Sequence, residues 1–380
     1  MLLDLQNIRR VVIKVGSSLM IGDDNQVRET WLRTLAKDVS ELRHQEIQVA
    51  VVTSGAVALG RQTLRYGNRA LKLEEKQAAA ACGQINLFSH WERAFQAENT
   101  NLHGAQILLT LDDSENRKRY LNARNTFETL LAEPQIVPII NENDTVATAE
   151  LIVGDNDRLA ARVAQMISAD LLFLFSDVDG LYTANPAVDA RAVHIPELRQ
   201  ITPEIEAMAG GAGSPFGSGG MRTKIEAAKI ALAAGCDMII GKGFAPHPIQ
   251  RILNGERCTR FRAAASPKSA RKHWISGSLH PTGTIVVDDG ARAALMKGNS
   301  LLPAGVRAVQ GAFERGDAVI IKDLGGRVLG KGLSAYSSTD AERIAGFKSS
   351  EIERILGYKG RDTLIHRDDM ALEIISESEI

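Results

Sequence analysis

The chain has 380 residues, of which 44% are hydrophobic, so it is too long for one comfortable core and we expect two domains. Its 45 basic and 46 acidic residues leave a net charge of -1, which excludes a general electrostatic field for nucleic acid or for an anionic membrane. Cys82, Cys236 and Cys258 fit no metal or redox spacing, so we expect reduced, mostly buried thiols. Because the sequence has no credible signal peptide or membrane span, we expect a cytoplasmic protein without a membrane partner.

Short runs of apolar, β-branched residues alternate with longer helical patterns along the first two thirds of the chain. We expect the short runs to be buried parallel strands and the periodic stretches to be helices. This alternation predicts an α/β fold, a three-layer αβα sandwich with a mainly parallel sheet, whose ligands bind beyond the carboxyl ends of the strands. The predicted strands are 11–15, 48–53, 106–110, 136–140, 171–175 and 238–240, and the predicted helices are 29–43, 76–96, 122–133 and 158–168.

Beyond about residue 243 this alternation ends and the pattern changes. We expect a first domain over residues 1–260, a linker over 261–277 that is rich in alanine and basic residues, and a second domain over 278–380. Glycine-rich turns in the second domain separate short strands, which predicts a small mixed-β barrel. These strands are expected at 283–287, 318–322, 328–332 and 363–366.

A glycine-rich run opens an alanine-rich helical stretch and is suited to holding phosphate. Glycines let backbone N–H groups converge on an anion, the helix N-terminus adds positive potential, and a lysine ends the run. A flexible surface loop would explain the glycines alone. The run comprises Gly217, Ser218, Gly219, Gly220, Met221, Arg222, Thr223 and Lys224.

Two further segments place polar groups where predicted strands end. Lys14 interrupts an apolar strand, and a buried ammonium is costly unless it faces an anion, although a lysine at a sheet edge can also reach solvent. Ser54 lies in a turn of small residues after the second strand, where it either meets an anionic ligand or caps the next helix. Phosphate is the natural partner for Lys14.

Amide and acidic side chains are concentrated after the fourth predicted strand and at the start of the following helix. Asp144 belongs to the first cluster, and Asn156 and Asp157 belong to the second. These groups can hold the ammonium of an amino acid, bind Mg²⁺ through water or position lysines; a solvated loop and an N-cap at Asp157 are the alternatives. After the fifth strand, Ser176 and Asp177 begin a turn-rich loop that either lines a nucleotide or is simply a turn.

Taken in order, these segments resemble the amino acid kinase family over nearly the whole chain. Within that family, they resemble the members that phosphorylate the γ-carboxylate of glutamate in the first step of proline biosynthesis. The C-terminal part resembles a PUA domain. The sequence has neither a P-loop motif nor a dinucleotide fingerprint after the first strand.

The resemblance implies a role for each motif residue. Lys14 and Lys224 neutralise the transferring phosphate and Asp157 orients them. Ser54, Asp144 and Asn156 hold glutamate. The nucleotide lies along Lys14, Ser176, Asp177 and the glycine-rich run from Gly217 to Lys224.

The resemblance also implies partners: ATP as co-substrate, Mg²⁺, L-glutamate, proline as feedback inhibitor, a homo-oligomer (dimer or tetramer) and a downstream reductase for glutamyl phosphate. A related kinase acting on another carboxylate or on carbamate would share the phosphate site. RNA binding through the PUA domain is the alternative of a different class, but residues 266–380 hold 16 basic and 15 acidic residues, which argues against it.

Overall fold

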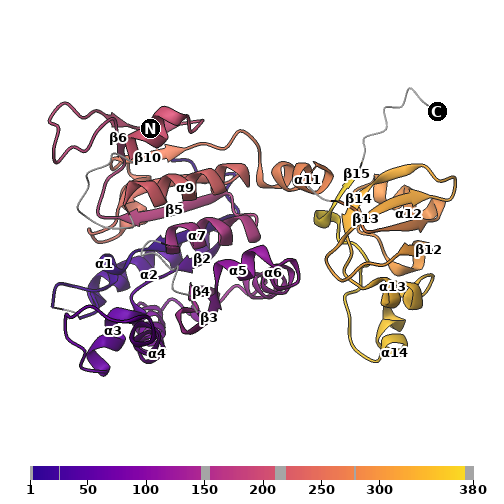
Figure 1. Cartoon of the computed structure of the whole chain (residues 1–380), viewed down its shortest axis with the longest axis horizontal. Helices are drawn as coiled ribbons and strands as arrows, with labels where there is room; N and C mark the ends of the chain where they lie inside the picture. The colour runs from indigo at the N-terminus through magenta and orange to yellow at the C-terminus, as the bar shows by residue number, and fades with distance from the viewer. Residues whose placement is uncertain (1–2, 25, 147–154, 210–219, 278–279, 373–380) are drawn as a thin grey trace. The chain divides into compact units, whose positions relative to one another are not determined.

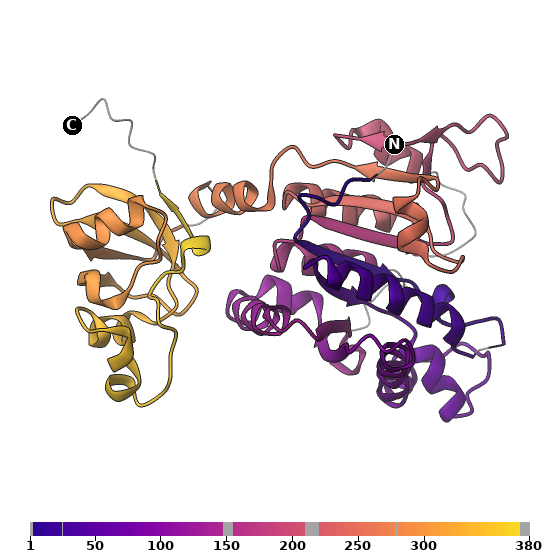
Figure 2. The same ribbon diagram turned by 180° about the vertical axis from the view of Figure 1, so that it is seen from behind.

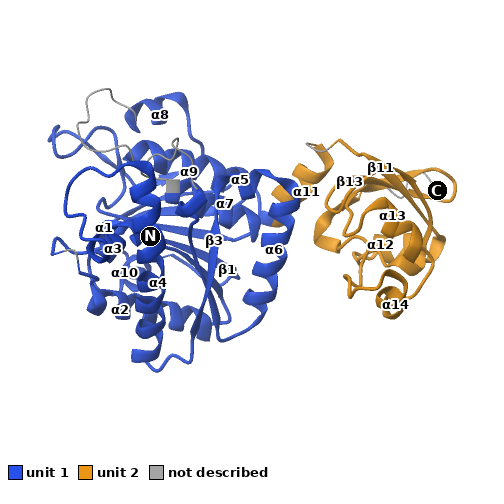
Figure 3. Ribbon diagram, turned by 60° about the horizontal axis from the view of Figure 1, so that its bottom comes forward, with its two compact units in different colours: residues 1–267 blue, residues 268–380 orange. Residues whose placement is uncertain are grey.

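The structure, a computed structural model, describes residues 3–24, 26–146, 155–209, 220–277 and 280–372. Two compact units are present, residues 1–267 (unit 1) and 268–380 (unit 2), coloured separately in Figure 3. Within the stretch expected to be a linker, Pro267–Gly277 form helix α11. The finer domain bounds given by the sequence remain predictions.

Unit 1 is built on an eight-stranded sheet in the order β3-β4-β2-β1-β5-β9-β10-β8. Its neighbouring strands are parallel except for β9 and β10, which are antiparallel. The strands are β1 (Arg10–Val15), β2 (Gln48–Val52), β3 (His103–Leu109), β4 (Ile136–Glu142), β5 (Leu171–Ser176), β8 (Glu197–Leu198), β9 (Asp237–Lys242) and β10 (Cys258–Phe261). A mainly parallel sheet is therefore confirmed.

Helices cover both faces of this sheet, as Figures 1 and 2 show from opposite sides. Because side chains alternate along a strand, Val11, Ile13 and Val15 of β1 pack in one core and Val12 packs in the other. The first core is shared with α1 (Ser17–Met20), α2 (Glu29–His44), α3 (Ala56–Thr63), α4 (Leu73–Ala97) and α10 (Pro248–Leu253). The second is shared with α6 (Arg117–Ala132), α7 (Asp155–Met166), α8 (Pro203–Ala209) and α9 (Met221–Ala233). The three-layer prediction is confirmed.

The remaining described elements of unit 1 are short. They are α5 (Leu111–Glu115), a 3₁₀ helix η1 (Asp144–Val146), and the two-stranded β6 (Leu181–Tyr182) and β7 (His194–Ile195). The predicted helix starting at 122 begins earlier, at Arg117, because the Asn116 side chain caps it by accepting a hydrogen bond from the Arg119 N–H.

One predicted strand differs in its surroundings. Residues 106–110 were expected to be buried, but β3 begins at His103 and forms the edge of the sheet, with several of its residues exposed. Thr110 lies outside the strand and caps α5 instead, accepting a hydrogen bond from the Asp113 N–H. An apolar run in the sequence does not reveal whether a strand has one neighbour or two.

Helices α3 and α4 approach each other at two glycines. A Cβ at Gly60 would lie 1.6 Å from the carbonyl oxygen of Ala79, and one at Gly83 would lie 1.8 Å from that of Ala56. Backbone therefore contacts backbone at this crossing, which leaves no space for a side chain at either position. Because Ala56 is the first residue of α3, the contact at Gly83 fixes the start of that helix directly after β2.

Unit 2 contains a five-stranded sheet in the order β12-β11-β13-β14-β15, with only β11 and β13 parallel. Its core combines these strands with α13 and α14. A buried ion pair, Arg271 Nη2 to Asp369 Oδ1 at 2.6 Å, joins α11 to the last 3₁₀ helix. The elements are β11 (Gly283–Val287), α12 (Asp289–Met296), η2 (Pro303–Gly305), β12 (Val306–Gly311), β13 (Ala318–Asp323), β14 (Val328–Leu333), α13 (Ser338–Ile344), η3 (Ser349–Glu351), α14 (Ile352–Leu356), η4 (Arg367–Asp369) and β15 (Met370–Leu372).

The strand expected at 363–366 is wrong. Leu364 and Ile365 are buried in the core of unit 2, but the segment makes only an isolated bridge between Ile365 and Leu301. The sheet is completed by β12 and β15, which the sequence pattern did not identify. Burial of two apolar residues requires a core, but a strand also requires a neighbour with free N–H and C=O groups.

Candidate active site

Two buried lysines share one carboxylate at the carboxyl edge of the sheet. Lys14 Nζ lies 2.6 Å from Asp157 Oδ1, and Lys224 Nζ lies 3.1 Å from Asp157 Oδ2. Lys14 comes from β1, Asp157 from the first turn of α7 and Lys224 from the first turn of α9. The alternation of β1 explains the meeting, since Lys14 follows Val12 on the face that α7 and α9 cover.

The electrostatics of this cluster are unbalanced. Asp157 is 1% exposed, Lys14 8% and Lys224 6%, so two ammonium groups share one carboxylate out of contact with most of the solvent. Burial lowers the pKa of Lys14 against the opposing attraction of Asp157, and the nearby Lys224 lowers it further. Burial acts to raise the pKa of Asp157, but the attraction of both lysines exceeds it and the pKa of Asp157 is lowered. Two lysine amines thus face a single carboxylate, and with both protonated the cluster carries one excess positive charge, which suits an anion.

The N-terminus of α9 adjoins the lysines. Gly220 is its N-cap, and Thr223 Oγ1 lies 2.9 Å from Asp157 Oδ2 and 3.0 Å from the Gly220 carbonyl oxygen. Met221 is half-buried at the start of the helix, while Arg222 is exposed and pairs with Glu226 at 3.2 Å. Gly217, Ser218 and Gly219 lie outside the described residues.

A second group of polar side chains surrounds Asn156, the residue directly before Asp157 in the sequence. Asn156 Nδ2 lies 2.6 Å from Ser54 Oγ, 3.0 Å from the Thr53 carbonyl oxygen and 3.3 Å from Asn141 Oδ1. The N-cap of α3 is Gly55, with φ 115°, and not Ser54. The interpretation of Ser54 as a helix cap is therefore wrong, and its hydroxyl contacts Asn156 instead.

The N-cap interpretation of Asp157 is also wrong. Asp157 is the third residue of α7, and its carboxylate contacts side chains of β1 and α9. Its place in the chain, directly after Asn156, joins the two polar groups into one site.

Asp144 follows β4 in η1 and is half-buried. Burial raises the pKa of this carboxyl to about 6. The described contacts place Asp144 in neither polar group above. The predicted loop at this position is shorter than expected, because β4 continues to Glu142 and includes Asn141.

The loop after β5 begins beside the lysines. Ser176 ends β5, and its hydroxyl donates to Asp177 Oδ1 at 2.7 Å. The charge of Asp177 acts on Lys14, raising the lysine's pKa slightly against the effect of burial. Tyr182 is turned away toward Asp179, whose carboxylate accepts from the phenol at 3.0 Å, and it packs edge-on against His194. Tyr182 is therefore packed and hydrogen-bonded within unit 1.

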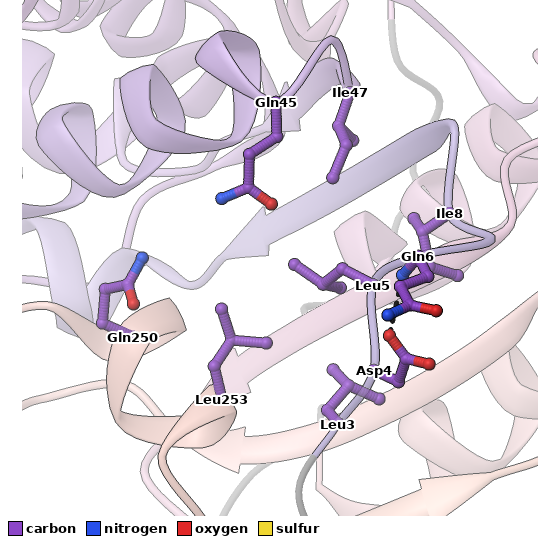
Figure 4. A pocket seen from close by; sticks show the side chains of 9 residues that line it. All are labelled: Leu3, Asp4, Leu5, Gln6, Ile8, Gln45, Ile47, Gln250 and Leu253. Carbon is purple, nitrogen blue, oxygen red and sulfur yellow. Dashed lines mark hydrogen bonds between the residues drawn. The ribbon is translucent and has the colours of Figure 1, made fainter.

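A cavity of about 400 Å³ lies elsewhere on unit 1. Figure 4 shows its lining from the N-terminal segment around Ile8, from the turn at Ile47 and from Leu253 of α10. Ile8 lies two residues before β1 and Ile47 directly precedes β2, so this cavity is at the amino ends of the strands, opposite the lysines.

Sequence reasoning missed two residues that support the site from α4. Gln84 Oε1 accepts from Asn141 Nδ2 at 2.8 Å, and Trp91 Nε1 donates to Thr53 Oγ1 at 3.2 Å. A signal was present, because positions 80, 84, 87 and 91 form one helical stripe, in which Ala80, Leu87 and Trp91 are buried and Gln84 is half-buried. A polar residue within such a stripe indicates a buried hydrogen bond.

The sheet, the buried lysines and the helix N-terminus beside them define a class: an α/β protein with a lysine-rich polar site at the carboxyl edge of a mainly parallel sheet, a place suited to an anion. The sequence profile of the Amino acid kinase family matches residues 9–242, and that of the PUA domain matches residues 283–356. The chain belongs to the amino acid kinase family and carries a C-terminal PUA domain; it is a kinase.

Curated relatives match almost the full length of the chain. Glutamate 5-kinase of Paramagnetospirillum magneticum is 59% identical over 96% of this chain and 98% of its own. Glutamate 5-kinases of Bradyrhizobium sp. and Gluconobacter oxydans are 54% and 51% identical, each over 97% of both chains. Among the described residues, no helix is long and apolar enough to cross a membrane.

Proposed function

We propose that this kinase transfers the γ-phosphoryl group of ATP to the γ-carboxylate of L-glutamate, giving L-glutamyl 5-phosphate and ADP. The observation that carries the proposal is the pair of buried lysines sharing Asp157 at the carboxyl edge of the sheet. The full-length similarity to glutamate 5-kinases supports glutamate as the acceptor.

The chemistry requires charge compensation more than acid–base catalysis. A γ-carboxylate with an ordinary pKa of about 4.3 is ionised at neutral pH, so the nucleophile needs no general base. The difficulty is to bring one anion in line with another, and preorganised cations act where charge is shared in the transition state. In this proposal Lys14 and Lys224 bind the transferring phosphoryl oxygens, while Asp157 holds both ammonium groups in place.

Glutamate would occupy the polar group beside the lysines. Ser54 and Asn156 are in contact at 2.6 Å, close to the end of β2, and we assign them to binding the amino acid. We assign Asp144 to its ammonium group, because a half-buried carboxylate with a raised pKa gains most from a cationic ligand.

The nucleotide would lie along the N-terminus of α9 and the end of β5. Gly220, Met221, Arg222 and Thr223 supply backbone N–H groups of the first turn, and Gly217, Ser218 and Gly219 precede them in the same run. Ser176 and Asp177 begin the loop beside Lys14.

Mg²⁺ would enter with ATP. Among the described residues there is no group of three or more His, Cys, Asp or Glu that could hold a metal ion, and both oxygens of Asp157 already face lysines. Mg²⁺ is commonly held by substrate phosphates and water with few side chains, which fits a site of this composition. When bound, it supplies further neutralisation of the phosphate charge.

The remaining assignments follow the same proposal. The reaction would be the first step of proline biosynthesis, proline would inhibit it, and a reductase would consume the labile acyl phosphate. We propose a dimer or tetramer formed through unit 1, and assign no RNA partner to the near-neutral PUA domain.

The test is an ATP- and Mg²⁺-dependent assay that traps the acyl phosphate with hydroxylamine. Glutamate, aspartate, carbamate and N-acetylglutamate would each be offered as acceptor, with and without proline. We expect hydroxamate from glutamate alone and less of it when proline is present. Turnover of another acceptor would contradict the substrate but keep the phosphate site, and no turnover with any acceptor would contradict the proposal.

A further inference from the structure

A chain of part-buried amide hydrogen bonds connects helix α4 to the site. Asn156 Nδ2 donates to Asn141 Oδ1 at 3.3 Å, and Asn141 Nδ2 donates to Gln84 Oε1 at 2.8 Å. Asn141 is 2% exposed at the end of β4, and Gln84 is half-buried on α4. Among the contacts of the described residues, Gln84 therefore reaches the site only through Asn141.

The direction of this chain is fixed by backbone. The Thr53 carbonyl can only accept a hydrogen bond, so the atom of Asn156 that lies 3.0 Å from it has to be the amide nitrogen. The same nitrogen faces Asn141 Oδ1 at 3.3 Å, the longest of its three contacts, so its two N–H groups are shared among three acceptors. Asn141 presents oxygen to it and turns its own nitrogen toward Gln84. Gln84 is the acceptor at the end of the chain.

This direction gives opposite hydrogen-bonding roles to the hydroxyl of Ser54 and to Oδ1 of Asn156. Ser54 Oγ lies 2.6 Å from the Asn156 nitrogen and accepts from it, so the hydroxyl proton of Ser54 is left to donate to an anion such as a carboxylate. Asn156 Oδ1 is buried and has no hydrogen-bond partner within the described parts of the chain, which leaves it to accept from a donor such as an ammonium group. An amino acid carries both a carboxylate and an ammonium group.

We infer that Gln84 is a positioning residue for the amino-acid acceptor: it holds Asn141, and through Asn141 it fixes Asn156 as an acceptor and Ser54 as a donor. Without an acceptor at position 84, the Asn141 amide can rotate by half a turn and present its nitrogen to that of Asn156. Two donors would then face each other, and the contact between Asn156 and Ser54 would loosen.

Helix α4 is well placed for this role because it is fixed against the same strand ends at two other points. Trp91 Nε1 donates to Thr53 Oγ1 at 3.2 Å, and Gly83 packs directly on the carbonyl of Ala56. Gln84 follows Gly83, so its side chain starts from one of the two closest contacts between α4 and α3. The backbone at position 84 has little freedom to shift.

The inference rests on the proposed function for the identity of the acceptor, and its test is steady-state kinetics of Gln84→Met. Methionine keeps the length and helix preference of glutamine but cannot accept from Asn141. We expect KM for glutamate to rise about tenfold, the effect of one buried hydrogen bond, while KM for ATP, kcat and the melting temperature stay close to those of the unaltered chain. Gln84→Leu, a second variant of different shape, should behave alike.

Gln96→Met is the matched control, because Gln96 is exposed on the same helix and bonds only to Glu92 within α4 among the contacts described. It should leave every constant unchanged. Asn141→Ala and the double variant with Gln84→Met complete a cycle: if Gln84 acts through Asn141, the double variant should be no worse in KM for glutamate than Asn141→Ala alone.

The outcomes separate this inference from the proposed function. If the unaltered chain does not phosphorylate glutamate, the proposed function fails before any variant is compared. If it does, an unchanged KM for glutamate in Gln84→Met overturns the inference. Equal loss in all constants together with a lowered melting temperature, or additive effects in the cycle, would overturn it also, because they indicate a merely structural role.

Discussion

The ammonium of Lys14 lies 2.6 Å from the carboxylate of Asp157, although one residue is in a strand and the other is in the first turn of a helix on the sheet's face. A lysine inside an apolar strand would ordinarily be destabilising. Here the fold supplies a counter-ion to it and then brings a second lysine to the same carboxylate. The excess positive charge that remains is what an anionic ligand would neutralise.

Replacing either lysine by methionine should reduce turnover strongly and stability little. Lys14→Met or Lys224→Met removes one of two preorganised cations, and loss of one such group costs on the order of 10²-fold in kcat. The measurement is kcat with saturating ATP and acceptor. Lys229→Met is the matched control for Lys224→Met, since Lys229 is on the same helix but exposed and paired with Glu206. Unchanged kcat in both lysine variants would remove them from the catalytic machinery.

Asp157→Asn should be strongly destabilising. The change leaves two buried ammonium groups without a counter-ion, and breaking a buried ion pair in this way costs about 3–5 kcal/mol. The measurement is urea-induced unfolding at pH 7. Glu206→Gln makes the same kind of change in an exposed pair with Lys229 and should cost at most about 1 kcal/mol. Equal effects of the two substitutions would mean that the lysines at Asp157 are compensated by another group.

Affinity for the acceptor should depend on pH through Asp144. Its pKa is raised to about 6 by burial, so the carboxylate that would hold an ammonium group is lost as the pH falls through 6. The ammonium and carboxylates of glutamate keep their charges between pH 5 and 7. We expect KM for glutamate to rise about tenfold from pH 7 to pH 5, as expected for one titrating group, and Asp144→Asn to have a high KM that is flat over this range.

Stability provides an independent readout for the same residue. A carboxyl whose pKa is higher in the folded than in the unfolded state opposes folding above pH 6, and this cost disappears below the unfolded value of about 4. Asp144→Asn should therefore raise the melting temperature at pH 7 but leave it unchanged near pH 4. A KM for glutamate in the unaltered chain that is constant from pH 5 to 7 would contradict the assignment of Asp144 to the ammonium.

The sequence predicts the two lysines of the cluster more readily than the residues that hold the neighbouring polar groups in place. Lys14 and Lys224 stand out locally, one as a charge within an apolar strand and the other at the end of a glycine-rich run before a helix. Gln84 does not stand out in this way. Its role depends on tertiary contacts, namely the crossing of α4 and α3 at Gly83 and the hydrogen bond from Asn141 of β4. Tertiary contacts of this kind leave only weak traces in one sequence.

The dependence on tertiary contacts also explains the wrongly predicted strand in unit 2. Residues 283–287 are a strand in both the prediction and the structure, because an apolar run there meets neighbours on both sides. Leu364 and Ile365 form a similar apolar run, but no sheet position adjoins them and only an isolated bridge results. Burial can be predicted from composition, whereas pairing depends on parts of the chain far away in the sequence.

Gly83→Ala should test whether the α3–α4 crossing supports the site. A Cβ at this position would lie 1.8 Å from the Ala56 carbonyl oxygen and 2.6 Å from the Gly60 nitrogen, both backbone atoms that cannot rotate away. The helices must separate, at a cost of about 1–3 kcal/mol or more. Because Ala56 follows Ser54 and Gly55 directly, the displacement would also reach Ser54, and we expect KM for glutamate to rise together with the loss of stability.

Gly277→Ala is the control for this substitution. Gly277 ends α11, a Cβ there meets no atom of the described residues within 4 Å, and alanine is the better helix former. The melting temperature of Gly277→Ala should equal or slightly exceed that of the unaltered chain, while that of Gly83→Ala should fall by several degrees. If Gly83→Ala were as stable as Gly277→Ala, the two helices would have to be separable at no cost, and the rigid placement of Gln84 and Ser54 by this crossing would be wrong.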